Sequence, residues 1–220
     1  MNDDVATDEG RDRRGDVRRR RVALAGHRGD AAAARRGLAD RDPRVQAAAL
    51  GALARLGELT TDDVRHALDN GPVELRRRAV AAAVGVRGKG SRSSLPVAVA
   101  AALEDPDPLV VVDAAWFVGE RRYRPAVPAL VRLATGHDDT RCREAAVAAL
   151  GAIGAAEGLP AVLAAAASDK PTVRRRATVA LAGFDDPRVE PALRQAAADR
   201  DWQVRQAAEE LLDEPSGESG

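Results

Sequence analysis

The chain of 220 residues has 34 basic and 34 acidic residues and therefore no formal net charge. This balance counts against a dedicated nucleic-acid or membrane binder, which usually carries a basic excess. Aromatic residues make up only 2% of the chain, so alanine, leucine and valine must form the core. Because alanine buries little area, many close helix–helix contacts must share the stabilisation, which favours a stack of helix pairs over one globular core.

The chain has a single cysteine, Cys142, which excludes an intramolecular disulfide. No apolar run approaches the ~18 residues that span a bilayer, and the charged N-terminal residues are unlike a signal peptide. We therefore expect a cytoplasmic location and no contact with a membrane.

Both ends of the chain are polar and have no hydrophobic period. Residues 1–11 and 214–220 are predicted to be disordered tails, and residues 12–213 are predicted to form one repeat domain. The first residues of that domain predict a single N-terminal helix. Its buried stripe would comprise Val17, Arg21, Leu24 and Ala25.

A similar segment recurs along the domain. It has an Asp-rich turn, a Val-Arg pair or a near equivalent, and then alanine and leucine at helical spacing. Successive copies lie 28 to 35 residues apart, and a purely helical period of ~30–45 residues is typical of an α-solenoid. We expect about six helix pairs after the N-terminal helix. The copies align on position zero, which is held by Val17, Val45, Leu75, Val110, Cys142, Val173 and Val204.

The second helix of each pair is predicted to start just before position zero. Small or apolar residues at 0, +4, +7 and +8 predict one buried stripe. An aspartate three residues before position zero can cap the helix, which stabilises it by ~1 kcal/mol. These aspartates are Asp42, Asp107, Asp139 and Asp201. The glycines predicted to end the helices are Gly57, Gly119, Gly154 and Gly183.

The first helix has a different marker in the last four pairs, a proline within an apolar run, which the first two pairs lack. A proline is tolerated near the start of a helix. These residues are Pro96, Pro128, Pro160 and Pro191. The longest gap between copies contains residues 85–94, a Gly/Ser-rich basic insertion that predicts a longer loop.

The repeated pattern D-x-D-P-x-V-R-x-x-A-x-x-A-L-G resembles a HEAT repeat of the phycobilin-lyase type, over roughly residues 12–213. The resemblance implies a right-handed all-α superhelix, with second helices lining the concave side. The chain departs from the pattern at four places: Gln46 and Val111 replace the usual arginine, Lys170 replaces the capping aspartate, and Leu75 follows Gly-Pro-Val-Glu. An Asp–Arg ladder between neighbouring repeats should therefore be interrupted at these positions.

Positions +2, +3 and +6 of the second helices lie beside the buried stripe. Solenoids bind partners on such surfaces, and tryptophan and arginine dominate binding hot spots. Alanine and glycine at these positions, as at Gly51, should leave room for a partner to approach. The predicted partner-binding residues are Arg77, Arg78, Asp113, Trp116, Glu144, Arg175 and Arg176. The alternative interpretation is a solvated charged face with an incidental tryptophan.

Several other residues are predicted to have structural roles. The arginines at position +1 should pair with the capping aspartates of a neighbouring repeat. They are Arg18, Arg76, Arg143, Arg174 and Arg205. Cys142 occupies a valine position and should be a buried apolar residue. Trp202 should cover the exposed end of the core, and the arginines of residues 11–21 should form a solvated helix face.

No catalytic or metal-binding motif stands out. His27, His66 and His137 form neither a His-Glu pair nor an HExxH motif. Among HEAT-like proteins, deoxyhypusine hydroxylase uses His-Glu dipeptides for iron, and this sequence has none. We therefore expect no metal, no cofactor and no catalysis, although a lyase-type activity stays open.

The predicted function is a scaffold module that binds a protein partner on its concave face. Two alternatives remain. The arginines could line a groove for nucleic acid, as in some HEAT-like arrays, and a groove of this kind should show steep salt dependence. The protein could also be a lyase or chaperone for a bilin-like ligand. The sequence does not identify the partner.

Overall fold

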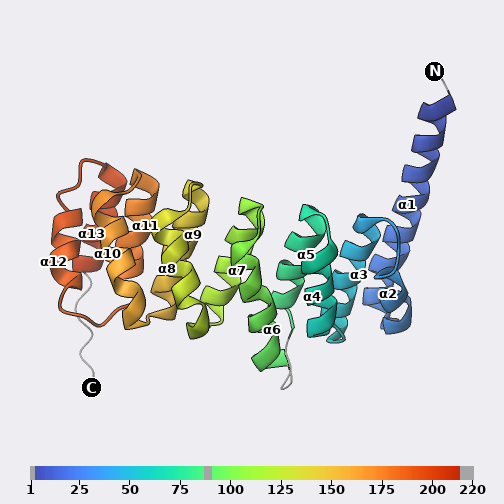
Figure 1. Ribbon diagram of the computed structural model, residues 1–220, viewed down its shortest axis with the longest axis horizontal. Helices are drawn as coiled ribbons and strands as arrows, with labels where there is room; N and C mark the ends of the chain where they lie inside the picture. Colours follow the sequence, from blue (N-terminus) through green and yellow to red (C-terminus); the bar gives the residue numbers. More distant parts are fainter. Residues whose placement is uncertain (1–2, 87–90, 214–220) are drawn as a thin grey trace. The chain divides into compact units, whose positions relative to one another are not determined.

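The computed structural model describes residues 3–86 and 91–213, with side chains for 13–86 and 95–213. In these ranges the chain forms an N-terminal helix and six helix pairs, and no strand (Figure 1). This confirms the predicted all-α solenoid architecture and the number of pairs. The chain divides into two compact units, Met1–Ala102 and Leu103–Gly220, and each is described separately. The division falls inside the single domain predicted for residues 12–213.

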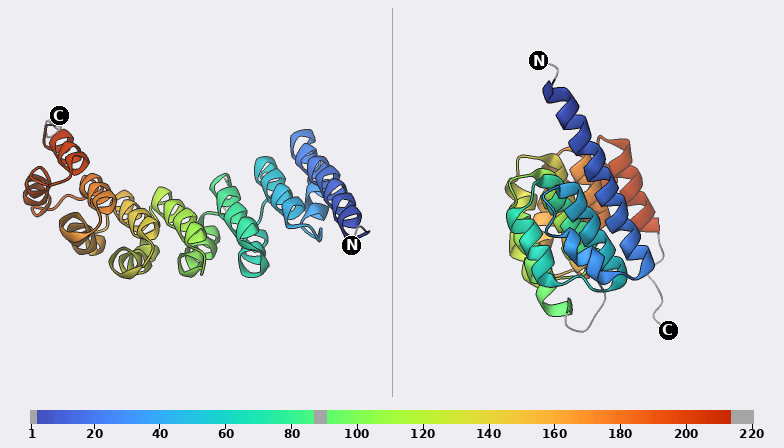
Figure 2. Two further views of the ribbon diagram at one scale, coloured as in Figure 1. Left: turned by 90° about the horizontal axis from the view of Figure 1, so that it is seen from above. Right: turned by 90° about the vertical axis from the view of Figure 1, so that its right-hand side faces the viewer.

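The first unit contains the N-terminal helix and the helices that follow it. These are α1 (Asp3–Arg28), α2 (Ala31–Gly37), α3 (Pro43–Leu56), α4 (Thr61–Asn70), α5 (Val73–Val84) and α6 (Ser91–Ala101). Helices α1, α3 and α5 pack side by side as one layer, while α2 and α4 pack against them (Figure 2). Helix α1 begins at Asp3 and so includes residues predicted to belong to a tail. The predicted tail 214–220 and residues 87–90 of the predicted loop 85–94 lie outside the described residues, and residues 91–94 of that loop belong instead to α6.

The second unit repeats the same two-layer arrangement. Its helices are α7 (Pro108–Glu120), α8 (Val127–Gly136), α9 (Thr140–Ile153), α10 (Leu159–Ser168), α11 (Pro171–Leu181), α12 (Val189–Ala196) and α13 (Trp202–Asp213). The short 3-10 turns η2 (Arg124–Ala126) and η3 (Ala156–Gly158) lead directly into α8 and α10, while η1 (Ala102–Glu104) begins at the last residue of the first unit. Helices α7, α9, α11 and α13 form the second-helix layer, and α8, α10 and α12 pack on it. Pro128 and Pro160 stand in the first turns of α8 and α10, as predicted.

The aspartates predicted as caps occupy the helix starts. The carboxylates of Asp42, Asp107 and Asp139 accept hydrogen bonds of 2.8 to 2.9 Å from backbone N–H groups at the starts of α3, α7 and α9. Asp201 does the same for α13. Lys170 makes no such side-chain bond at the start of α11, as its departure from the pattern predicts.

Two of the four predicted terminating glycines adopt the left-handed conformation that ends a helix. Gly57 and Gly154 have φ values of 72° and 67°. Gly119 was wrongly predicted to end its helix, because it lies inside α7 and the chain turns at Arg122, with φ of 47°. Gly119 is instead the point where α9 comes closest: an added Cβ there would lie 3.0 Å from the Cα of Ala149.

Such glycine–alanine contacts join successive second helices within each unit. An added Cβ on Gly26 of α1 would lie 2.8 Å from the Cα of Ala52 in α3, and one on Gly151 of α9 would lie 2.6 Å from the Cβ of Ala180 in α11. Real Cβ atoms do not approach this closely. Because glycine has no Cβ, the helices can approach closely at these positions, and the close approach strengthens the dispersion attraction between them.

The residues at position zero are buried in six of the seven copies. Val45, Leu75, Val110, Cys142, Val173 and Val204 are all buried. Val17 and Leu24 are 67% and 48% exposed, whereas Ala25 is buried, so the stripe predicted for α1 was right only at Ala25. That stripe would have placed Arg21 in the core; instead α1 turns Val22 toward Val45 and Ala49 of α3.

Cys142 is a buried apolar residue, as predicted. Its Sγ lies 3.5 Å from the carbonyl oxygen of Pro108, and burial raises the pKa of the thiol to about 11. The thiol is therefore protonated at neutral pH and a poor nucleophile.

Arginines at position +1 form ion pairs with the turn of the next helix pair. Arg143 reaches Asp169 with its Nε and Nη2 atoms at 2.8 and 2.9 Å, and Arg174 reaches Asp199 at 2.8 and 2.7 Å. Arg18 pairs with Asp40 in the first unit. We call each of these bidentate pairs a rung. In two of them the aspartate, Asp40 or Asp199, stands two residues before the helix-capping aspartate, so the prediction that the caps themselves are the partners was wrong.

The arginines of the two rungs in the second unit also hold the turns before their own helices. Arg143 Nη1 donates to the carbonyl of His137, and Arg174 Nη1 donates to that of Asp169. Arg205, in the last helix, donates to Asp199 in the same way. The rungs are interrupted at Gln46 and Val111, as predicted, since neither residue has a guanidinium. The interruption predicted at Lys170 was wrong, because the neighbouring Asp169 still forms a rung with Arg143.

We predict that Gly151→Ala destabilises the second unit by ~1–3 kcal/mol, because the added methyl group overlaps Ala180. The matched control is Gly136→Ala at the end of α8, where an added Cβ meets nothing within 4 Å. That control should be neutral or raise stability by up to ~1 kcal/mol through backbone entropy. Urea unfolding followed by circular dichroism measures both variants. Equal effects of the two substitutions would contradict the packing argument.

A second prediction concerns acid stability. The hydrogen bond from Arg174 holds the pKa of Asp199 below its ordinary value. Asp199 therefore stabilises the folded state above the unfolded-state pKa of ~3.9, and this stabilisation is lost as pH falls through the lower folded-state pKa. Asp199→Asn should cost ~1–3 kcal/mol at neutral pH, and the difference from the intact protein should shrink in acid. Urea unfolding across a pH series tests this, and a difference independent of pH would refute it.

Candidate partner-binding surfaces

The predicted binding residues lie on second helices of both units. Arg77 and Arg78 belong to α5 in the first unit. The second unit has Asp113 and Trp116 on α7, Glu144 on α9, and Arg175 and Arg176 on α11. Trp116 is 53% exposed, as a partner-binding residue must be. Arg77, Arg175 and Arg176 are also exposed, while Asp113 and Glu144 are half-buried.

A pocket of about 530 Å³ lies on the second-helix face of the second unit. It brings together three of the predicted residues, Trp116, Glu144 and Arg176, from three successive helices. Asp113 and Arg175 do not line it. We call it the α7–α9–α11 pocket. Its other lining residues are Val112, Gly119, Glu120, Arg141, Ala145, Ala148, Ala149 and Ala152.

Small residues make the floor of this pocket. Gly119 and Ala149, which allow α7 and α9 to approach closely, also line it. Because these residues have almost no side chain, the ring of Trp116 stands above its neighbours and stays exposed. The pocket therefore offers an aromatic surface, an apolar floor and charges of both signs.

The charged groups beside Trp116 differ in how they are satisfied. Arg141 is bound to Asp139, with Nη2 and Oδ2 2.7 Å apart. The hydrogen bonds and ion pairs of the described residues include none made by the side chains of Glu120, Glu144 or Arg176. Their hydrogen-bonding groups are available to a bound partner.

The first unit has a groove of about 840 Å³ between α1, α3 and α5. We call it the α1–α3–α5 groove. Arg78 lines it and Arg77 does not. The guanidinium of Arg78 lies over Gly51, and its Nε is 3.4 Å from the carbonyl oxygen of Ala47. The expectation that Gly51 leaves room for a partner was therefore wrong, because Arg78 occupies that space.

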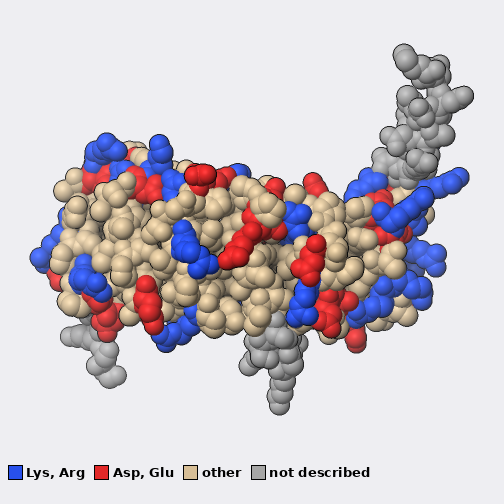
Figure 3. All heavy atoms as spheres, in the orientation of Figure 1, with Lys and Arg blue, Asp and Glu red and all other residues tan. Residues whose placement is uncertain are grey.

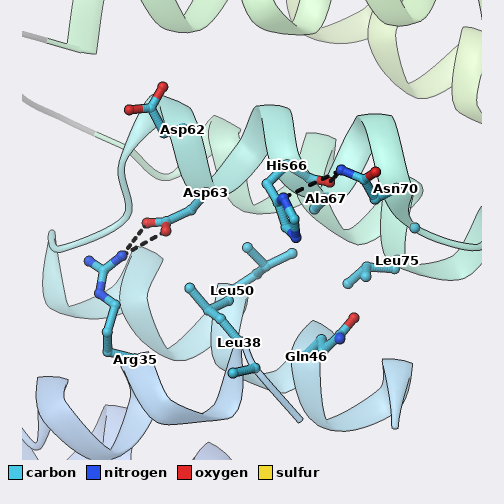
Figure 4. A pocket seen from close by; sticks show the side chains of 12 residues that line it. Arg35, Leu38, Gln46, Leu50, Asp62, Asp63, His66, Ala67, Asn70 and Leu75 are labelled. Atoms are coloured by element: carbon cyan, nitrogen blue, oxygen red, sulfur yellow. Dashed lines mark hydrogen bonds and ion pairs between the residues drawn. The ribbon is translucent and has the colours of Figure 1, made fainter. Parts of the chain in front are cut away.

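A third cavity, which no sequence pattern predicted, lies between α2, α3, α4 and the start of α5. It measures about 520 Å³. Leu38, Leu50 and Leu75 lie between Gln46 on one side and His66 and Asn70 on the other (Figure 4).

This cavity marks the place of a missing rung. Gln46 Nε2 donates to the carbonyl of Asp40 at 2.6 Å, which is the backward bond that arginine makes elsewhere. Asn70 stands five residues before position zero, where Asp40 and Asp199 stand in rungs, and its Nδ2 donates to the carbonyl of His66. Two neutral side chains, Gln46 and Asn70, thus stand where other repeats have an arginine–aspartate ion pair. The departure at Gln46 and the asparagine at 70 were the available sequence signals.

Other candidates for chemistry are not assembled into a site. The described residues contain no group of three His, Cys, Asp or Glu side chains that could hold a metal ion. His137 has a structural contact, since its Nδ1 accepts a hydrogen bond from the backbone of Asp139.

Trp202 is 62% exposed at the start of α13, so the prediction that it covers the end of the core was wrong. Of the helices in residues 3–86 and 91–213, none is long and apolar enough to cross a bilayer.

Comparisons with known proteins agree on the fold. The HEAT-repeat family model matches residues 95–181 and, in an overlapping match, 159–215. No curated protein sequence matches the chain.

Among solved structures, the complex of CpcE and CpcF of phycocyanin lyase from Nostoc sp. PCC7120 has a TM-score of 0.60 and 23% identity, covering 81% of this chain and 74% of that chain. An engineered protein has a TM-score of 0.60 and 19% identity, with coverages of 83% and 97%. A designed armadillo repeat protein, solved with the peptide (KR)4, has a TM-score of 0.56 and 16% identity, with coverages of 80% and 95%. At these identities the likeness concerns the fold alone.

We predict that Gln46→Arg combined with Asn70→Asp builds the missing rung and fills part of the cavity between α2, α3 and α4. The double variant should be more stable than the sum of the single substitutions, by a coupling energy of ~0.5–3 kcal/mol. Gln46→Lys with Asn70→Asp is the control, because lysine has the charge without the bidentate fork. Urea unfolding of all variants gives the coupling energy. Additive effects in the arginine pair would show that no rung forms.

Proposed function

The chain belongs to the HEAT-repeat family, and on that premise we propose that it is a non-catalytic scaffold module that binds a protein partner on its second-helix faces. Repeat solenoids of this kind commonly serve as protein-interaction scaffolds. We propose that Trp116, Glu144 and Arg176 form the central contact in the second unit, with Asp113 and Arg175 at its margin. Arg77 and Arg78 are the proposed contacts in the first unit.

The exposed ring of Trp116 over the α7–α9–α11 pocket is the observation that supports this proposal most strongly. A large aromatic side chain left half in water gains free energy when a partner covers it. Phe117, the next residue, is buried in the core, so the helix directs one aromatic inward and the other outward. A pocket with one aromatic residue and a few polar groups is typical of a binding hot spot.

Glu144 and Arg176 supply specificity in this proposal. A partner that places a donor at Glu144 and an acceptor at Arg176 satisfies both groups, whereas a partner that buries them unpaired is penalised. The carboxylates of Glu120 and Glu144 also count against a phosphate backbone in this pocket, since like charges repel.

We predict that Trp116→Ala weakens partner binding by about 2 kcal/mol or more, roughly thirtyfold in Kd. Affinity capture from native lysate, with and without nuclease, identifies the partner, and calorimetry with the purified partner gives the Kd. Trp202→Ala is the matched control, because Trp202 is also more than half exposed in the same unit but does not line the pocket.

The expected result is a partner that resists nuclease, binds the Trp202→Ala variant normally and is lost with Trp116→Ala. If Trp116→Ala retains every captured protein, the pocket is not the binding site. Capture that disappears with nuclease would indicate nucleic acid instead. A visible absorbance change on titration with a bilin would favour the ligand-binding alternative.

A further inference from the structure

The two units carry opposite net charges, which cancel in the whole chain. Residues 1–102 contain 20 lysines and arginines against 14 aspartates and glutamates, and residues 103–220 contain 14 against 20. Basic side chains gather over α1–α3 on the face that Figure 3 shows. The zero net charge therefore does not argue against an anionic partner for the first unit.

Within that unit, two arginines lie in the α1–α3–α5 groove on top of glycines. The guanidinium of Arg78, from α5, lies over Gly51 of α3. An added Cβ on Gly26 of α1 would lie 3.1 Å from Nη2 of Arg55, which comes from α3. Each arginine thus rests on the preceding second helix, where the missing side chain leaves it space. Both side chains line the same groove.

These two guanidiniums have no carboxylate partner among the described residues. The other arginines of the groove do have one: Arg44 is bound to Asp42 at 3.2 Å and Arg19 to Asp16 at 3.4 Å. The one recorded bond of Arg78 is the 3.4 Å contact with a carbonyl oxygen. Arg55 and Arg78 therefore keep most of their donors for an external acceptor, in a fork geometry that fits a carboxylate.

The rest of the lining favours an acidic peptide over a nucleic acid. Ala23, Ala47, Ala48, Pro43 and Pro72 give the groove an apolar surface, which small side chains of a peptide can cover and a sugar–phosphate backbone cannot. Glu74 also lines the groove and would repel a continuous row of phosphates. A peptide can place its carboxylates at the arginines and a neutral residue beside Glu74.

We propose that the α1–α3–α5 groove binds an extended acidic segment of a protein partner, in which carboxylates alternate with small apolar side chains, and that Arg55 and Arg78 hold the carboxylates. This inference names the partner chemistry of the first unit and so rests on the proposed function in general. It does not depend on the Trp116 pocket.

The test uses the full chain and a fluorescent synthetic peptide of alternating glutamate and alanine. Fluorescence anisotropy should show saturable binding that weakens with salt. Arg55→Gln with Arg78→Gln should weaken binding about tenfold or more, the factor that corresponds to one lost charge-assisted contact. Trp116→Ala should bind the peptide as the intact protein does, which separates this result from the test of the second unit.

The matched control is Arg36→Gln with Arg65→Gln. It removes the same charge from exposed arginines of α2 and α4 in the same unit, outside the groove. Its peptide affinity should stay within about twofold of the intact protein, since distant exposed charges are screened. Thermal unfolding verifies that both double variants are folded.

Three results would overturn the proposal. The first is no binding of the peptide, and the second is equal weakening by the groove variant and the control, which would reduce the effect to net charge. The third is tighter binding of a single-stranded oligonucleotide that the groove variant abolishes, which would assign the groove to phosphates.

Discussion

The close contact between successive second helices is the constraint on which the rest of this structure depends. Gly26 against Ala52, Gly119 against Ala149 and Gly151 against Ala180 leave no space for a further methyl group. A core built largely from alanine gains little from any one side chain, so it needs many backbone-to-backbone approaches. The same small residues project little from the surface of the second-helix layer, which is why the side chain of Trp116 remains exposed there.

Ion pairs connect one helix pair to the next in regions that this apolar packing does not reach. The rung from Arg174 to Asp199 joins α11 to the turn before α13, and the same arginine ties down its own turn. Where Gln46 and Asn70 replace the pair, the turn is still held but a cavity opens. The presence or absence of an arginine–aspartate ion pair thus determines whether the gap between neighbouring repeats is filled or remains as a cavity.

The two units combine the same architecture with different surface chemistry. The groove of the first unit has arginines seated over glycines, and the pocket of the second has an aromatic ring flanked by carboxylates. Because a repeat fold fixes its helices through buried positions, the outward positions are free to vary. One chain can therefore combine a first unit with a basic excess and a second unit with an acidic excess, and the two net charges cancel to zero.

The sequence alone determined the local features of this protein: the helix pairs, the capping aspartates and the interruptions at Gln46 and Val111. Each depends on residues close together in the chain, whose spacing repeats in every copy. It also placed Trp116, Glu144 and Arg176 on one face. Only the tertiary structure decided which side of α1 is buried, that Gly119 is a contact and not a helix end, and that Arg78 fills the space over Gly51. These outcomes depend on how one helix is rotated and how closely it approaches another. Contacts between side chains far apart in the sequence determine both, so no local sequence pattern predicts them.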